Sequence, residues 1–214
     1  MARIDLARRA QIGRNRRART RAELIRAART LYAARPFDAV TVDDLVSAAG
    51  VAKGTFYVHF DSLDDLQSVL ADDLAREFDD LWQPHRASLD DPIERIAAGC
   101  GTFIKQALQD PAWGALIVRG AVSMPDVARV PRKRLNEDVC QAAAIGRLND
   151  VEPAIAFELV LGITIRAMQS AAEGHLKPKQ APAIVAGILR AIGLPAKEAE
   201  EIAFRLVTPD RRQS

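Results

Sequence analysis

Apolar residues recur every three to four positions along nearly the whole chain, the spacing that places them on one face of an α-helix. No segment shows the strict alternation of apolar and polar residues that is typical of a half-buried β-strand. A first helix is expected over residues 20–34, where Leu24, Ala28 and Leu31 share a face. Pro36 prevents this helix from continuing. The pattern therefore predicts an all-α protein.

Two short helices separated by a sharp turn are predicted in the segment TVDDLVSAAGVAKGTFYVHFDSLDDL, which begins at Thr41. Thr41 is a good N-cap for the first of them, and the aspartates that follow suit the positive end of a helix. Gly50 supplies the backbone freedom that the turn requires. The second short helix is expected over residues 53–59, with Phe56 and Phe60 pointing inward.

Longer helices are predicted for the rest of the chain. The next one begins near Asp61 or Ser62 and reaches about Trp82, because its leucines and Phe78 keep helical spacing. Prolines recur at the starts of the later segments, where a missing amide hydrogen is tolerated. These segments are residues 92–109, 111–123, 126–148, 153–174, 181–192 and 195–207.

Charge is distributed unevenly along the 214 residues, although the net charge is only +2. Residues 1–60 hold 12 basic and 5 acidic side chains, a net charge of +7, and the remainder carries −5. A basic N-terminal quarter attached to an acidic remainder suggests a module that binds a polyanion.

Composition is that of a globular protein, with 49% hydrophobic and 27% charged residues. No run of about 18 consecutive apolar residues and no apolar secretory segment is present, so we expect no membrane partner and a cytoplasmic location. Cys100 and Cys140 have no metal-ligand spacing. They are expected to pack as small apolar residues, and a redox role for the pair remains an alternative.

Two short helices joined by a glycine turn describe a helix-turn-helix, whose second helix can enter the major groove of DNA. The sequence AGVAKGTFYVHF, from Ala49 to Phe60, closely resembles the DNA-binding segment of TetR-family regulators. A basic first helix and an all-helical remainder of suitable size agree with this resemblance, which covers residues 20–66 in detail.

The resemblance implies three parts: a basic arm over residues 1–18, a three-helix DNA-binding domain over 19–62, and a helical ligand-sensing and dimerisation domain over 63–214. It implies a homodimer that binds a double-stranded DNA operator as a transcription factor at the nucleoid, with a small-molecule effector of unknown identity. Repression is the family's usual mode. No cofactor and no metal are implied.

DNA contacts follow from the same resemblance. Lys53 would meet a phosphate or a guanine edge, and Gly54 would let the backbone approach DNA closely. Tyr57 and His59 resemble the family's phosphate clamps, although such residues more often simply pack. The full set of implied DNA-binding residues is Thr41, Lys53, Gly54, Thr55, Tyr57, His59, Arg17 and Arg21.

The basic arm has two interpretations. Its arginines can reach into a flanking minor groove, whose narrow A·T stretches attract guanidinium groups. Alternatively, they keep a flexible tail in solution, and the arm can also extend helically onto the first helix. The arginines concerned are Arg14, Arg16, Arg17, Arg19 and Arg21.

Three residues depart from the family pattern. Val46 stands where a smaller alanine is usual, Ala52 where serine or threonine often caps the recognition helix, and Leu63 where a lysine commonly holds a phosphate. The second change removes a capping hydrogen bond, and the third puts one backbone contact in doubt.

Bulky residues of the C-terminal domain are candidates to line an apolar pocket, although most such residues are ordinary core. The candidate ligand-binding residues are Phe78, Trp82, Phe103, Trp113, Phe157 and Arg166. The family's dimer interface corresponds to residues 153–174 and 181–192. The branched residues there equally suit an interface between protomers or the core of one protomer.

Two other classes of protein were weighed. The aspartate pairs near residues 64, 72 and 79 lack a D-D-x-x-D spacing, and no zinc, di-iron or nucleophile-elbow motif is present, so an enzyme is not expected. An architectural or partner-regulated DNA-binding protein of the same fold remains the alternative. Dense packing of the C-terminal domain would favour it, and a closed apolar cavity of several hundred cubic ångström would favour a ligand sensor.

Overall fold

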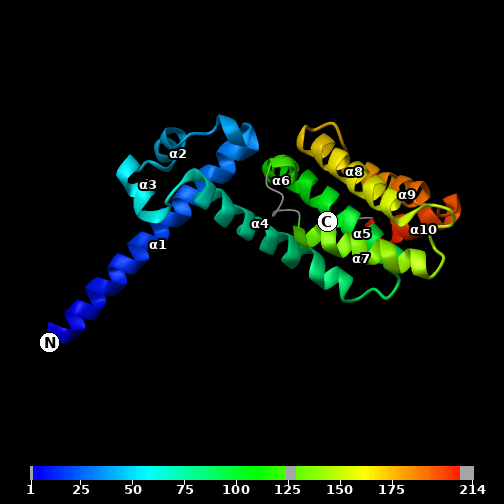
Figure 1. The fold of residues 1–214 in the computed structure, drawn as a ribbon, viewed down its shortest axis with the longest axis horizontal. Coiled ribbons are helices and arrows are strands. Elements are labelled where there is room, and N and C mark those ends of the chain that lie inside the picture. Colours follow the sequence, from blue (N-terminus) through cyan, green and yellow to red (C-terminus); the bar gives the residue numbers. More distant parts are fainter. Residues whose placement is uncertain (1, 124–128, 208–214) are drawn as a thin grey trace. The chain divides into compact units, whose positions relative to one another are not determined.

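The computed structural model describes residues 2–123 and 129–207, and within these ranges it contains helices and no strand (Figure 1). The all-α prediction is therefore confirmed. The chain divides into two compact units, Met1–Leu70 and Ala71–Ser214, called here the head and the body. The helix α4 (Leu63–Arg86) contributes residues to both units.

The head contains α1 (Ala2–Ala34), the short 3-10 helix η1 (Phe37–Ala39), α2 (Val42–Ala49), α3 (Lys53–His59) and the start of α4. Its core is aromatic at two points: Tyr32 stacks on Phe37 with ring centroids 4.2 Å apart, and Phe56 contacts Phe60. The fully buried large side chains of the head are Leu24, Tyr32, Leu45, Phe56, Phe60, Leu66 and Leu70.

Residues 2–18 continue α1 as one helix rather than forming a separate flexible arm. Side chains one turn apart support the helix over residues 11–23: Gln11 Nε2 donates to Asn15 Oδ1 at 2.9 Å, and Arg19 pairs with Glu23 at 2.9 Å. Arg14, Arg16 and Arg17 therefore lie at fixed positions around a helix.

The two short helices agree with the sequence prediction because local signals fix both ends of α2. Thr41 and Asp44 form a reciprocal capping box, in which each side chain accepts a hydrogen bond from the backbone N–H of the other residue. Gly50 ends the helix in the left-handed conformation, with φ 66° and ψ 33°.

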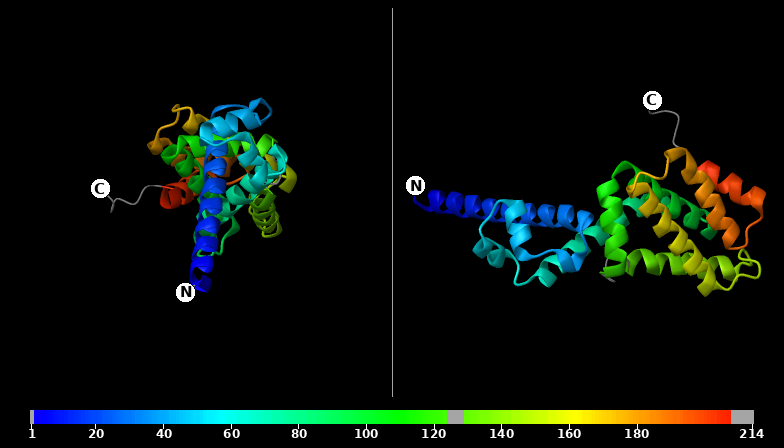
Figure 2. Two further views of the ribbon diagram at one scale, coloured as in Figure 1. Left: turned by 90° about the vertical axis from the view of Figure 1, so that its left-hand side faces the viewer. Right: turned by 90° about the horizontal axis from the view of Figure 1, so that it is seen from above.

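The body consists of the rest of α4 and of α5 (Pro92–Gln109), α6 (Pro111–Ser123), α7 (Arg129–Ala144), α8 (Pro153–Ala172), α9 (Ala181–Ala191) and α10 (Ala196–Val207), with η2 (Pro178–Gln180) before α9. Helix α5 is central and contacts each helix from α6 to α10, and α9 and α10 lie side by side (Figure 2). The first turns of α5, α6 and α8 begin with proline, as predicted.

Two predicted helix ends are wrong. Helix α4 does not stop near Trp82 but continues through Pro84 to Arg86, whose Nη2 donates to Asp138 of α7 at 2.9 Å. This partly buried tertiary contact holds the last turn of α4 in place, although the proline removes one backbone hydrogen bond from it. Helix α7 ends at Ala144 instead of residue 148, because Gly146 adopts a positive φ of 73°. The expected residues 126–128 lie outside the described part of the chain.

Helix α8 is long and apolar enough to cross a membrane by length and composition alone, a test that core helices of soluble proteins also pass. It packs against α5, α6, α7 and α9. At least part of its apolar surface is therefore buried inside the body.

Candidate functional site

Helix α3 buries one face and exposes the other. Phe56 is fully buried, whereas Tyr57 is 51% exposed, and Lys53 and Gly54 are exposed as well. A Cβ placed on Gly54 would meet no other atom within 4 Å. Packing inside the protein therefore does not require a glycine there, which leaves the surface around α3 open to a close-fitting partner.

Lys53 is held by an acidic neighbour in the free protein. Its Nζ lies 2.9 Å from Asp43 Oδ1 on α2, and this contact raises the pKa of the ammonium group. Both side chains are largely exposed. A phosphate that binds Lys53 must therefore compete with Asp43.

A basic groove of about 320 Å³ lies between α1 and the end of α3. It is lined by Arg14, Arg17 and Arg21 of α1 and by Val58 and His59. Arg17 Nη2 donates to the backbone oxygen of Val58 at 3.0 Å, and the guanidinium of Arg21 lies over the ring of Phe60. These contacts fix the groove between segments that are about 40 residues apart in sequence.

Electrostatics in this basic groove favour an anion. Partial burial, together with the positive charges of Arg17 and Arg21, lowers the pKa of His59. A phosphate oxygen that accepts hydrogen bonds from two of these side chains would reduce the electrostatic repulsion among their positive charges. The groove was missed from the sequence because it depends on α1 continuing helically toward its N-terminus.

The remaining predicted DNA contacts lie nearby with different roles. Thr41 is exposed, but its hydroxyl donates to Asp44 Oδ2 at 2.7 Å and accepts from the Asp44 N–H at 3.2 Å. Thr55 is half-buried, and its backbone N–H donates to Ala52, which caps α3 without a side-chain hydrogen bond. Leu63 is half-buried as the first residue of α4.

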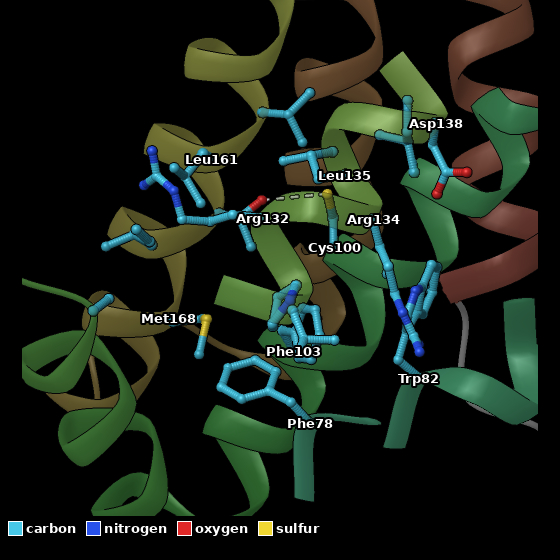
Figure 3. Close-up of a pocket in the computed structure, with 18 of the residues that line it drawn as sticks. Phe78, Trp82, Cys100, Phe103, Arg132, Arg134, Leu135, Asp138, Leu161 and Met168 are labelled. Carbon is cyan, nitrogen blue, oxygen red and sulfur yellow. Dashed lines mark hydrogen bonds between the residues drawn. The ribbon is translucent and has the colours of Figure 1, made fainter. Parts of the chain in front are cut away.

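The body contains a partly open, largely apolar cavity of about 100 Å³ lined by residues of α4, α5, α6, α7 and α8 (Figure 3). Three of the six predicted ligand-binding residues, Phe78, Trp82 and Phe103, line it, and their rings contact one another. Its other apolar walls are formed by Ile96, Ile117, Leu135, Val160, Leu161, Ile165 and Met168.

The other three predicted ligand-binding residues do not line this cavity. Trp113 packs behind Phe78 with ring centroids 5.6 Å apart. Phe157 lies under the guanidinium of Arg132, at 5.2 Å from its ring centroid. Arg166 is exposed on α8, where it faces Glu173 at 3.8 Å. The sequence pattern identified large side chains but not the direction in which each one points.

Charged side chains at the cavity wall form ion pairs that the sequence did not reveal. Arg95 Nε donates to the buried Asp138 at 2.8 Å, and Arg134 Nη1 lies 2.6 Å from Asp79 Oδ1. These partners are 43 and 55 positions apart in sequence, so no local motif could indicate them.

The two cysteines have different surroundings and are not linked to each other. Cys100 is buried at the cavity, where its Sγ accepts a hydrogen bond from Thr164 (Figure 3), and burial raises its pKa to about 11. A thiol with such a pKa stays protonated at neutral pH and is a poor nucleophile. Cys140 is exposed on α7.

Trp82 packs closely on α5 at Gly99. A Cβ at this position would lie 2.8 Å from the indole ring, closer than any ordinary contact. The glycine therefore determines how far the tryptophan withdraws from the cavity.

One face of α8 is not fully covered by the described residues of the chain. Ile155 is 53% exposed and Gly162 is exposed, while Leu159 and Ile163 are half-buried. Four other apolar residues of these two segments, for which interface and core were both open, are buried in the core of the body: Met168, Ile188, Leu189 and Ile192. Among the described residues, no cluster of histidine, cysteine or acidic side chains is arranged to hold a metal.

Comparison with protein families gives two matches, which together cover most of the chain. Residues 24–67 match the family described as bacterial regulatory proteins, tetR family. Residues 91–205 match the tetracyclin repressor-like C-terminal domain. A relative from Rhodococcus jostii, the HTH-type transcriptional repressor KstR2, is 42% identical over 67 residues. That alignment spans 31% of either chain.

Solved structures with the same fold include RolR in complex with resorcinol, which is 28% identical, has a TM-score of 0.65, and aligns over 92% of this chain and 98% of its own. CprB from S. coelicolor A3(2) is 19% identical, with a TM-score of 0.67, over 91% of this chain and all of its own. FadR from Bacillus subtilis, solved with stearoyl-CoA, is 14% identical, with a TM-score of 0.65, over 80% and 96%.

Proposed function

The chain belongs to the TetR family of bacterial regulatory proteins, with a DNA-binding and a ligand-binding domain, and on this basis we propose that it is a homodimeric repressor. It binds a palindromic operator through α3 and leaves the DNA when a small, largely apolar molecule binds the body. It acts in the cytoplasm at the nucleoid.

The observation that carries this proposal is the exposed surface of the head, where the recognition helix α3 and the basic groove adjoin. Lys53, Gly54 and Tyr57 lie on the exposed face of α3, the face that would enter the major groove. Arg17 and Arg21, with His59, offer positive charge for the flanking phosphates. Contacts to the DNA bases would then come from α3, and contacts to the DNA backbone from the adjoining basic groove.

The partly exposed apolar face of α8 supports a dimer. Ile155, Leu159 and Gly162 follow one another at helical spacing on this face, and Ile184 of α9 is also incompletely buried. Small and branched residues allow two helix pairs to pack closely in a symmetric interface. A dimer places two copies of α3 at half-sites that are about one helical turn apart.

The apolar cavity supports an effector. Its volume of about 100 Å³ is smaller than the several hundred cubic ångström that we expected of a sensor, but most of its lining residues are aromatic or aliphatic, and four of its five charged side chains form ion pairs with one another. The structure of RolR with resorcinol, a single-ring compound, is consistent with a small effector for this body as well. The architectural alternative predicts dense packing here instead.

The proposal is tested by selecting bound fragments from random duplex DNA with the full-length protein. We expect a palindrome to be enriched, and we expect Lys53→Ala and Tyr57→Ala to weaken binding to it while leaving the helical content unchanged. Binding without sequence preference would contradict the proposal and favour the architectural alternative.

Replacing Asp43 by asparagine is expected to strengthen operator binding several-fold. The change frees Lys53 from its ion pair and removes a negative charge close to the DNA-facing surface. Affinity is measured by fluorescence anisotropy with a labelled operator. The matched control is Asp38→Asn, an exposed aspartate in η1, for which we expect a smaller gain. An equal gain in both variants would show a general charge effect rather than release of Lys53.

A further inference from the structure

Helix α4 is attached to the rest of the body mainly by side chains. Helix α5 packs closely against each helix from α6 to α10, whereas α4 has no extended backbone contact with any of them among the described residues. The rings of Phe78 and Trp82 line the cavity. Three polar residues, spaced by about one helical turn along α4, meet α7: Asp79, Gln83 and Arg86.

Arg134 of α7 joins the middle of this line of contacts. Its Nη1 lies 2.6 Å from Asp79 Oδ1, and the amide oxygen of Gln83 accepts from the same nitrogen at 2.9 Å. The side chain of Asp79 is 37% exposed and that of Arg134 17%, so water can take over these contacts when the two helices separate. An ion pair with such access to water opens at a lower cost than a buried one.

The other charged side chains of the lining hold α7 in place. Asp138 of α7 accepts from Arg95 of α5 at 2.8 Å, and these side chains are only 2% and 9% exposed. Asp138 also binds Arg86, at the far end of α4, at 2.9 Å. Arg132, the third arginine of the lining, lies over the ring of Phe157 on α8. Helix α7 is therefore fixed to α5 and α8, and α4 is anchored to it at one end.

The cavity needs a moving wall before it can admit a molecule. It is partly open, yet Cys100 at its wall is only 5% exposed. Its volume of about 100 Å³ is also smaller than that of a dry cavity of about 150 Å³ that binds benzene. Among the helices that line the cavity, α4 is the one whose backbone is not packed closely against its neighbours. It is therefore the wall that can move without disrupting helix packing.

We propose that small molecules enter the cavity between α4 and α7, and that the contact of Arg134 with Asp79 and Gln83 closes this entrance. When the contact opens, the body half of α4 moves away from α7 while Arg86 keeps its far end at Asp138. The entrance goes beyond the function proposed above and does not depend on DNA binding.

Modification of Cys100 in the full-length protein measures the opening. Replacing the exposed Cys140 by serine leaves Cys100 as the single thiol. The probe is methyl methanethiosulfonate, a small uncharged thiol reagent. All rates are compared at one fixed alkaline pH, because burial raises the pKa of the Cys100 thiol to about 11.

In this background, Arg134→Gln is expected to accelerate the modification about threefold to tenfold, because loss of the ion pair raises the population of the open form by that factor. Asp79→Asn should accelerate it similarly. The double variant should react no faster than the faster single variant, since either change alone breaks the same contact. Unchanged rates in both single variants, or fully multiplicative effects in the double variant, would overturn the proposal.

The matched control is Arg132→Gln, which removes the same charge from the same helix and from the same lining but from a contact with α8. We expect no acceleration there, and an equal acceleration would place the opening elsewhere and overturn the proposal. The rate should also stay nearly constant at low urea concentrations, because the opening exposes little surface. A steep rise with urea would show that Cys100 reacts only through global unfolding, which would likewise contradict the proposed entrance.

Discussion

Replacing Asp138 with alanine is expected to lower the free energy of unfolding by about 3–5 kcal/mol, because the change leaves the buried guanidinium of Arg95 without its counter-ion. Asp138 is 2% exposed, and its Oδ1 accepts from Arg95 Nε at 2.8 Å and from Arg86 Nη2 at 2.9 Å. After the substitution Arg95 keeps hydrogen bonds to the carbonyl oxygens of Leu89 and Asp90 but has no ion-pair partner.

Thermal and urea unfolding, followed by circular dichroism at one fixed protein concentration, measure this loss, since the stability of a dimer depends on concentration. The matched control is Glu137→Ala. Glu137 precedes Asp138 on α7 and lies 3.4 Å from the same Arg86, but it is about half exposed, so its removal should cost less than about 1 kcal/mol. Similar losses in both variants would show that the buried pair contributes no more than a surface ion pair.

The double substitution Arg14→Ala/Arg17→Ala is expected to reduce operator affinity by two to three orders of magnitude at about 0.15 M salt, because in the proposed homodimer it would remove four phosphate contacts. Both arginines line the basic groove, and Arg17 is fixed by its hydrogen bond to Val58. The slope of log affinity against log salt should become shallower by about 3–4, since each phosphate contact contributes about 0.9.

Titration of a labelled operator at several salt concentrations measures both quantities. The control is Arg19→Ala/Arg26→Ala, which removes the same charge from exposed positions of α1 that do not line the groove. A much smaller change is expected there. If the control variant loses as much affinity and slope, the effect comes from the net charge of the head, and the groove is not a phosphate site.

Local signals explain why the helix-turn-helix could be predicted almost to the residue. Thr41 caps α2 through its own side chain and Gly50 ends it, so both boundaries depend on residues within a few positions. Pro92, Pro111 and Pro153 mark the starts of three body helices for the same reason.

Features that depend on distant residues could not be predicted in this way. The basic groove requires Arg17 to meet Val58, 41 positions later, and the last turn of α4 is held by Arg86 at Asp138, 52 positions later. Helical spacing distinguishes a buried face from an exposed one. It does not tell whether Trp113 faces the cavity or packs behind the ring of Phe78. Three of the six residues proposed from the pattern line the cavity, and the other three point elsewhere.

The contact between Trp82 and Gly99 restricts the order in which this body can change during evolution. A side chain at residue 99 clashes with the indole at 2.8 Å, so that position cannot acquire one while the tryptophan remains. The tryptophan can shrink first, which enlarges the cavity and widens the range of molecules that it accepts. A later gain of volume at residue 99 would narrow that range again. If the cavity holds the effector, as proposed, a lineage that shrinks the tryptophan first would pass through a regulator that accepts a wider range of molecules.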